Sequence, residues 1–152
     1  MEQIKFNYND GGRALAGYKG KTGDCVCRAI AIASGRPYQE VYDRLADGNF
    51  SQRKTKRTKK QKRTASEGIN TGRKWFKEYM KELGFKYVTC MTIGSGCKVH
   101  LREDELPKGR LVVCLSKHYA SVIDGVLNDT YDCSREGTRC VYAYYIFNQT
   151  KN

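Results

Sequence analysis

Apolar side chains with helical spacing dominate the first half of the chain. Residues 25–33, CVCRAIAIA, are apolar almost all round, and Ser34-Gly35 ends this run before Pro37. Such a pattern is typical of a buried helix. Pro37 suits a first helical position, and apolar residues then recur at helical spacing until Gly48, which predicts an amphipathic second helix.

A long polar segment separates these helices from a third helical pattern. Residues 49–68 hold almost no apolar side chain after Phe50, so we expect a mobile basic loop or an extension of the second helix. Thr71 can cap a helix with large apolar residues on one broad face, and Gly84 ends it. The glycine-rich segment before Gly23 predicts irregular chain that leads into a tight turn.

The second half of the chain shows strand patterns. Residues 85–89 alternate in polarity, residues 111–115 form an apolar run, and a last strand is expected over residues 140–147. Between them, Asp124-Gly125 is a strong two-residue hairpin signal because Ile and Val flank it. We therefore expect several antiparallel strands.

This hairpin turn also predicts a register for its two strands. If Ile123 pairs with Val126, alternation places His118 on the first strand and Asp129 on the second on the same face, as diagonal neighbours. Helices followed by strands predict an α+β fold in which a buried helix packs on an antiparallel β-sheet. We expect one domain over residues 1–152, with a basic loop insertion at about 50–68.

The composition favours a packed protein outside membranes. Hydrophobic residues make up 39% of the 152 residues, and no stretch approaches the roughly 20 apolar residues of a membrane span. The N-terminus lacks the apolar core of a signal peptide, so we expect a cytoplasmic protein. An odd number of cysteines, seven, then favours reduced thiols, and the only close pair, Cys25 and Cys27, has an unusual spacing for zinc, so we expect no metal and no cofactor.

The positive charge is concentrated in one segment. The chain holds 28 Lys and Arg against 16 Asp and Glu, a net charge of +12. Eight of these cations fall within RKTKRTKKQKR and no acid does; they are Arg53, Lys54, Lys56, Arg57, Lys59, Lys60, Lys62 and Arg63. Such a segment is most often a solvated loop, but it can bind nucleic acid or steer an acidic protein.

Cys25 stands where a thiol can become a nucleophile. The positive end of a helix and a neighbouring imidazolium both favour the reactive thiolate. His118 can supply the imidazolium, and Asp129 can hold its ring in the required tautomer. We therefore predict a Cys25, His118 and Asp129 triad, while a buried inert thiol remains the alternative for Cys25.

Three other residues are of the same chemical types as the triad residues. His100 is the only other histidine, but it has no obvious acid on a paired strand. Asp132 competes with Asp129 as the acid that orients the histidine. Cys27 lies about 200° around the helix from Cys25, so it should be a structural residue.

The residues around the candidate nucleophile and base resemble known families. Gly-x-x-Gly-Asp-Cys at 20–25, followed far downstream by a histidine at the head of an apolar strand and an acid on the next, resembles the papain-like superfamily of cysteine peptidases. The runs GDCVCRA and HYASV are also similar to those in ovarian-tumour-type deubiquitinases. TGDCVCRAIAIASG, IGSGCKVHL and VIDGVLNDTYD resemble stretches of small bacteriophage and prophage proteins, a resemblance that implies no activity.

The superfamily resemblance implies a cysteine-nucleophile hydrolase, peptidase or isopeptidase-like, that acts on a protein or peptide. The family usually places a glutamine before the nucleophile to bind the oxyanion, whereas Lys19 stands near that place here. The Cys25 amide should supply one donor, and Lys19, Thr22 and Asp24 are candidates to influence the second, Asp24 by shaping the turn. The alternative is a nucleic-acid-binding or host-interaction protein that uses the 53–63 segment on an inactive papain-like scaffold.

Overall fold

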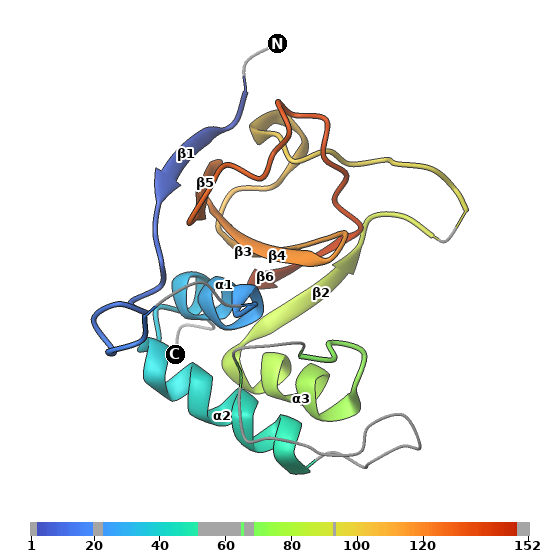
Figure 1. The fold of residues 1–152 in the computed structure, drawn as a ribbon. Coiled ribbons are helices and arrows are strands. Elements are labelled where there is room, and N and C mark those ends of the chain that lie inside the picture. Colours follow the sequence, from blue (N-terminus) through green and yellow to red (C-terminus); the bar gives the residue numbers. More distant parts are fainter. Residues whose placement is uncertain (1–2, 20–22, 52–64, 66–68, 93, 149–152) are drawn as a thin grey trace.

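The computed structural model describes residues 3–19, 23–51, 65, 69–92 and 94–148. Within these residues three α-helices lie together beside a six-stranded sheet (Figure 1). The helices are α1 (Cys25–Ser34), α2 (Tyr38–Ser51) and α3 (Lys74–Leu83), with a short 3-10 helix, η1, at Glu103–Glu105. The strands are β1 (Lys5–Tyr8), β2 (Phe85–Thr89), β3 (Arg110–Leu115), β4 (His118–Ile123), β5 (Val126–Asp129) and β6 (Ala143–Phe147).

The sheet is mixed, so the expected α+β class is confirmed but the purely antiparallel sheet is wrong. The strand order is β1-β5-β4-β3-β6-β2, and every neighbouring pair is antiparallel except β1 and β5. β1 lies in the segment expected to be irregular. Its four residues are all exposed at the sheet edge, so it carries no apolar alternation that would reveal a strand.

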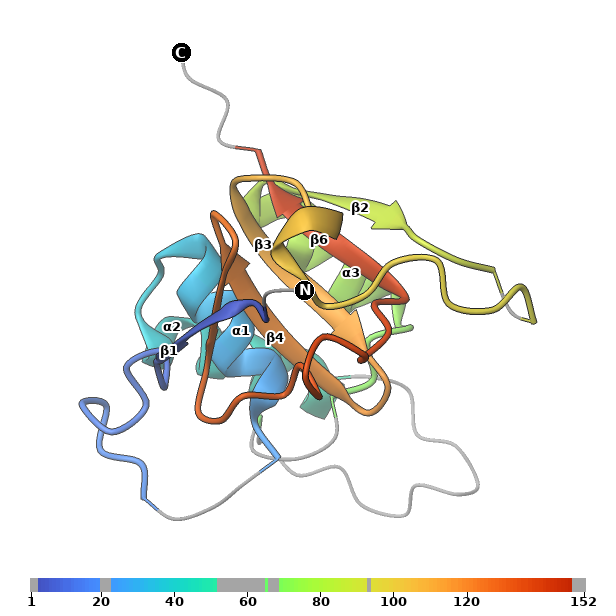
Figure 2. The ribbon, with the colours of Figure 1, turned by 90° about the horizontal axis from the view of Figure 1, so that it is seen from above.

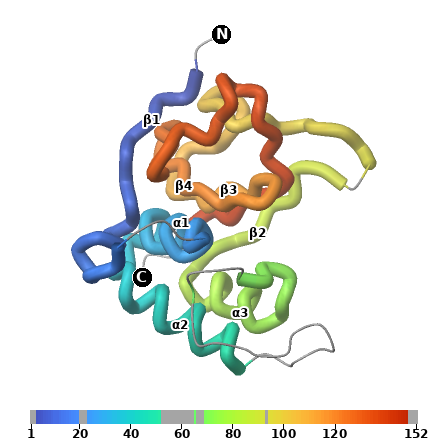
Figure 3. The backbone as a smooth tube through the Cα atoms, in the orientation of Figure 1, coloured from blue at the N-terminus to red at the C-terminus, as the bar shows by residue number. Residues whose placement is uncertain are grey.

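Alternate residues of the central strand β3 enter two different cores. Val112 and Cys114 pack with the helices, whereas Leu111, Val113 and Leu115 pack with the loops after β2 and β5. The helices accordingly lie on one side of β3 and β4 and these loops on the other (Figure 3). The two cores hold the central strands from both faces and fix the position of their ends.

Helix α1 is buried along almost its whole length and packs beside β4 (Figure 2). It ends as expected at Gly35, which adopts the left-handed conformation and donates its N–H to the Ala31 carbonyl. The hairpin of β4 and β5 also has the predicted register, since Ile123 pairs with Val126. Both turn residues, Asp124 and Gly125, have positive φ, as this kind of turn requires.

Two helix boundaries differ from the prediction. α2 does not stop at Gly48 but continues to Ser51. The absence of a Cβ at Gly48 serves packing instead, because a Cβ there would collide with the Trp75 ring. α3 begins at Lys74, three residues beyond Thr71, which is not its cap. The glycine is therefore a packing contact between two helices rather than a helix end.

The structure describes only part of the predicted insertion at about 50–68. The described residues do not form the expected loop without core contacts. Residues up to Ser51 belong to α2, and Ala65 is fully buried in the core formed with the helices. All eight cations between Arg53 and Arg63 lie outside the described residues.

The expectation of wholly reduced thiols is wrong for one pair, because Cys97 and Cys140 form a disulfide. The chain after β2 runs back beside the segment that leads into β6: His100 bridges to Cys140, and the Val141 N–H donates to the Val99 carbonyl. The same pairing shortens the last strand, which starts at Ala143 instead of Cys140. Because the two cysteines are 43 positions apart, their proximity is invisible in the sequence.

None of the helices in the described part of the chain has the length and apolar character needed to cross a bilayer.

Candidate active site

His118 and Asp129 form the buried pair that the hairpin register predicts. His118 is the first residue of β4 and Asp129 is the last residue of β5. The His118 Nε2 and Asp129 Oδ2 atoms are 2.6 Å apart, and both side chains are buried. A second carboxylate oxygen, Oδ1, accepts the Thr130 N–H at 2.7 Å, which fixes the orientation of the carboxylate. Nε2 is thereby engaged, and Nδ1 is the ring nitrogen available to another partner.

Cys25 is the first residue of α1 and lies on the same side of the site. Its side chain and that of His118 line one cavity, and the interaction with His118 lowers the pKa of the thiol, so the structure brings all three predicted triad residues together. The thiol is half-buried and lines a cavity of about 450 Å³. The cavity is also lined by Gly23, Thr71, Lys117, His118 and Tyr119.

The surroundings of Cys25 favour its thiolate form. Burial would raise the pKa of this thiol, but the hydrogen bonds from the His118 side chain and the Tyr119 backbone and the charges of His118 and Arg28 outweigh it and lower the pKa. The other free cysteines behave differently. Burial raises the pKa of Cys90 and Cys133, and raises that of Cys27 and Cys114 to about 12.

The pKa values of His118 and Asp129 are shifted in the directions that favour their charged forms. Burial alone would lower the pKa of His118, but hydrogen bonds with Asp129, Cys133 and Cys25 raise it to about 12. Burial would raise the pKa of Asp129, yet the His118 side chain, the Thr130 amide and Arg28 lower it. The neighbourhood therefore stabilises an imidazolium between two anionic partners.

Cys133 is a residue of this site that the sequence did not reveal. Its sulfur, a His118 ring nitrogen and an Asp129 oxygen all lie within 4.8 Å of one another, and these are atom types that bind zinc. However, an Arg28 nitrogen lies 3.6 Å from Asp129, and its positive charge opposes a divalent cation there. Cys133 is 2% exposed, and burial raises the pKa of its thiol, which favours the neutral form.

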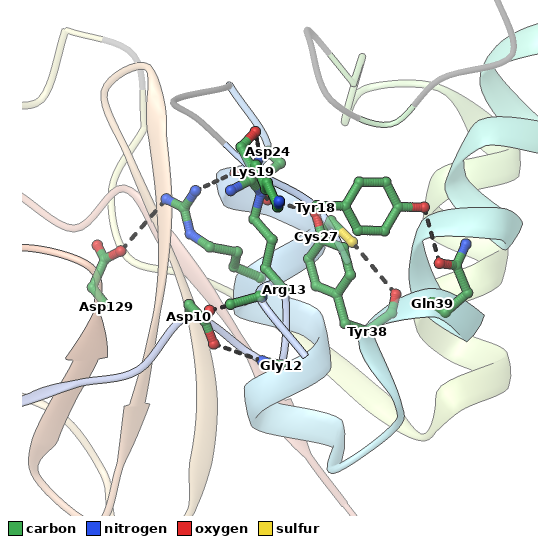
Figure 4. Close-up of polar contacts among 12 residues, drawn as sticks. Asp10, Gly12, Arg13, Tyr18, Lys19, Asp24, Cys27, Tyr38, Gln39 and Asp129 are labelled. Atoms are coloured by element: carbon green, nitrogen blue, oxygen red, sulfur yellow. Dashed lines mark hydrogen bonds and ion pairs between the residues drawn. The ribbon is translucent and has the colours of Figure 1, made fainter. Parts of the chain in front are cut away.

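A buried ion-pair network supports the start of α1 (Figure 4). The Asp24 carboxylate pairs with Arg28 one turn later, accepts the Tyr38 hydroxyl at 2.6 Å and lies 3.2 Å from the Arg13 Nε atom. Arg28 continues the network to Asp129, so it connects the turn before the nucleophile with the acid of the triad. The spacing of Asp24 and Arg28 by four residues was a signal for their pairing that sequence reasoning could have used.

The three candidates for the oxyanion site have different outcomes. The Asp24 carboxylate is buried in the ion-pair network at the start of α1, and its role of shaping the turn for the oxyanion site stays a prediction. Lys19 is exposed and lines a different hollow from the one that holds Cys25, so it is not placed at the reacting group. Thr22 lies outside the described residues.

The alternatives to the triad residues have other partners. Asp132 accepts hydrogen bonds from the amide and the hydroxyl of Ser134, so it does not orient His118. His100 does have an acid, Glu105, whose carboxylate is 3.1 Å from Nδ1, but this acid belongs to η1 and not to a paired strand. It does not line the Cys25 cavity. Cys27 is fully buried near the Tyr38 carbonyl, as expected of a structural residue.

This geometry can perform nucleophilic chemistry at a carbonyl. A thiol with a lowered pKa lies at an open cavity, a histidine lines the same cavity, and an acid fixes that histidine. The chain matches no family model, no curated protein and no solved structure, so the functional argument rests on this arrangement of residues.

Proposed function

We propose that the protein is a cysteine-nucleophile hydrolase of the papain-like kind, which cleaves amide or isopeptide bonds in a protein or peptide substrate. One observation carries the proposal: Cys25, alone among the five free cysteines in having a lowered pKa, lines the same cavity as a histidine that a buried aspartate holds. A nucleophile at the start of a buried helix and a base at the head of a strand agree with the resemblance to the papain-like superfamily.

The proposed reaction proceeds through a covalent thioester. The Cys25 thiolate attacks the carbonyl carbon, a carbon–sulfur bond forms, and the carbonyl oxygen takes the negative charge. His118 then gives its Nδ1 proton to the leaving nitrogen as the carbon–nitrogen bond breaks. A water molecule next loses a proton to His118 and attacks the thioester carbon, which releases a carboxylic acid and regenerates Cys25.

Asp129 acts through His118 in this scheme. Its carboxylate accepts from Nε2, so Nδ1 faces the thiol in both steps. The α1 N-terminus assists the first step because unpaired amides in the first turn favour negative charge. The Cys25 N–H belongs to this turn and is the expected first donor to the oxyanion.

Selective alkylation tests this proposal. With the disulfide intact and no added reductant, iodoacetamide near neutral pH should modify Cys25 at least ~10-fold faster than Cys27, Cys90, Cys114 or Cys133, since only Cys25 has a lowered pKa. Peptide mapping by mass spectrometry at timed intervals gives the rate at each site.

The matched control replaces His118 with alanine. Cys25 then loses the hydrogen bond and charge that lower its pKa, so its modification should slow about 10-fold while the other four sites keep their rates. If Cys25 and the partly exposed Cys90 react at equal rates in the unmodified protein, the proposal loses its basis.

A further inference from the structure

A hollow of about 840 Å³ lies beside the candidate active site, and neither Cys25 nor His118 lines it. Three cationic side chains and three tyrosines dominate its lining: Tyr8, Arg13, Tyr18, Lys19, Arg28 and Tyr131. Guanidinium, ammonium and phenol groups all donate hydrogen bonds, so the hollow offers donors to a ligand.

The two carboxylates of this lining are already engaged. Asp10 accepts the N–H groups of Gly12 and Ala14, and Figure 4 shows its carboxylate turned toward its own turn. Asp24 is 1% exposed and is bound by two arginines and a tyrosine. Neither carboxylate is therefore free to receive a cationic ligand.

Two of the cations have donor capacity left. Arg28 is 9% exposed, and its Nε atom has no hydrogen-bond partner although it is fully shielded from solvent. Lys19 is exposed and forms no ion pair with any residue that the structure describes. A carboxylate in the hollow would therefore meet two positive charges, one of them on a guanidinium that is largely buried and so weakly screened.

The hollow adjoins the acid side of the triad through several contacts. Arg28 is 3.6 Å from Asp129, and the amide of Thr130, another lining residue, holds the Asp129 carboxylate. The Tyr131 ring centre is 5.4 Å from that of His118, and this tyrosine is 51% exposed. A ligand in the hollow would thus lie next to the residues that hold the reacting groups.

We propose that this hollow is a substrate subsite for a carboxylate-bearing residue, glutamate or aspartate, close to the scissile bond. The inference rests on the proposed function and names its substrate class: an acidic peptide segment. The carboxylate lies among Lys19, Arg28 and the tyrosine hydroxyls, and the peptide backbone extends past Tyr131 toward the cavity at Cys25.

Paired peptide libraries test the subsite. Each pair fixes glutamate or its uncharged isostere glutamine at one position and randomises the others. At one position, glutamate should raise kcat/KM at least ~10-fold over glutamine, the effect of one hydrogen bond to a charged group. Lys19→Glu should reduce this ratio several-fold, whereas Lys77→Glu, on the exposed face of α3, should leave the ratio unchanged.

A binding measurement separates failure of the subsite from failure of catalysis. In the Cys25→Ser variant, which cannot form the thioester, fluorescence anisotropy should show tighter binding of the glutamate library than of its glutamine partner. Equal affinities at every position would overturn the subsite even if Cys25 proves reactive. Preferential binding of glutamate peptides without any cleavage would support the subsite and contradict the hydrolase.

Discussion

Replacing Cys25 with alanine should lower kcat/KM for peptide cleavage by at least ~10³-fold, because the carbon–sulfur bond of the thioester can no longer form. His118→Ala should cause a loss of similar size, since the thiolate loses its stabilising partner and the leaving nitrogen loses its proton donor. The measurement is the initial rate of cleavage of the best library-derived peptide, with folding of each variant checked by circular dichroism.

Cys27→Ala is the matched control for this experiment. It removes the same thiol from the same helix, but Cys27 is buried away from the cavity and its pKa is raised to about 12. Its cleavage rate should stay within a few-fold of the unmodified protein. Retained cleavage in Cys25→Ala would show that another group performs the reaction.

Asp24→Ala should lower the free energy of unfolding by about 3–5 kcal/mol, the usual effect of removing one partner from a buried ion pair. The carboxylate is the common partner of Arg13, Arg28 and the Tyr38 hydroxyl, and its side chain is fully buried. Its loss takes this counter-charge from the Arg13 guanidinium and leaves Arg28 with the longer contact to Asp129. Urea unfolding followed by tryptophan fluorescence gives the value.

An exposed ion pair gives the comparison for this substitution. Glu82 lies 3.6 Å from Arg44, and their side chains are 64% and 40% exposed. Glu82→Ala should therefore change the free energy of unfolding by at most about 1 kcal/mol. If Asp24→Ala proves no more harmful than Glu82→Ala, the network does not support the start of α1 as described.

The strongest local patterns in the sequence predicted the parts of the site that lie close together along the chain. The two-residue turn at Asp124-Gly125 determines the register of β4 and β5, and this register brings His118 next to Asp129. The apolar run ending at Gly35 likewise indicated a buried helix that starts at Cys25. Both features depend on short-range geometry, which a sequence pattern can express.

Features that depend on contacts between distant segments were not visible in the sequence. β1 is held at the sheet edge by pairing with β5, more than a hundred residues later, and has no apolar alternation of its own. Cys133 reaches the triad through the loop after β5, and the disulfide of Cys97 depends on a similar return of the chain. Gly48 suggested a helix end because glycine often ends helices. Its place in the structure depends on the tertiary contact with Trp75, which a local sequence pattern does not express.

The most direct test of the central claim is a pH titration of the Cys25 thiolate, followed by its ultraviolet absorbance as the difference between the unmodified protein and Cys25→Ser. Because the pKa of Cys25 is lowered and that of His118 is raised to about 12, the ion pair of thiolate and imidazolium should dominate between the two. As the pH falls, the thiolate signal should therefore persist below about 8.5, the ordinary thiol value, and then disappear. In His118→Ala the two contributions of the histidine are lost while burial, the Tyr119 amide and the Arg28 charge remain, so the step should move to higher pH. A step at or above about 8.5 in the unmodified protein, unmoved by His118→Ala, would contradict the account.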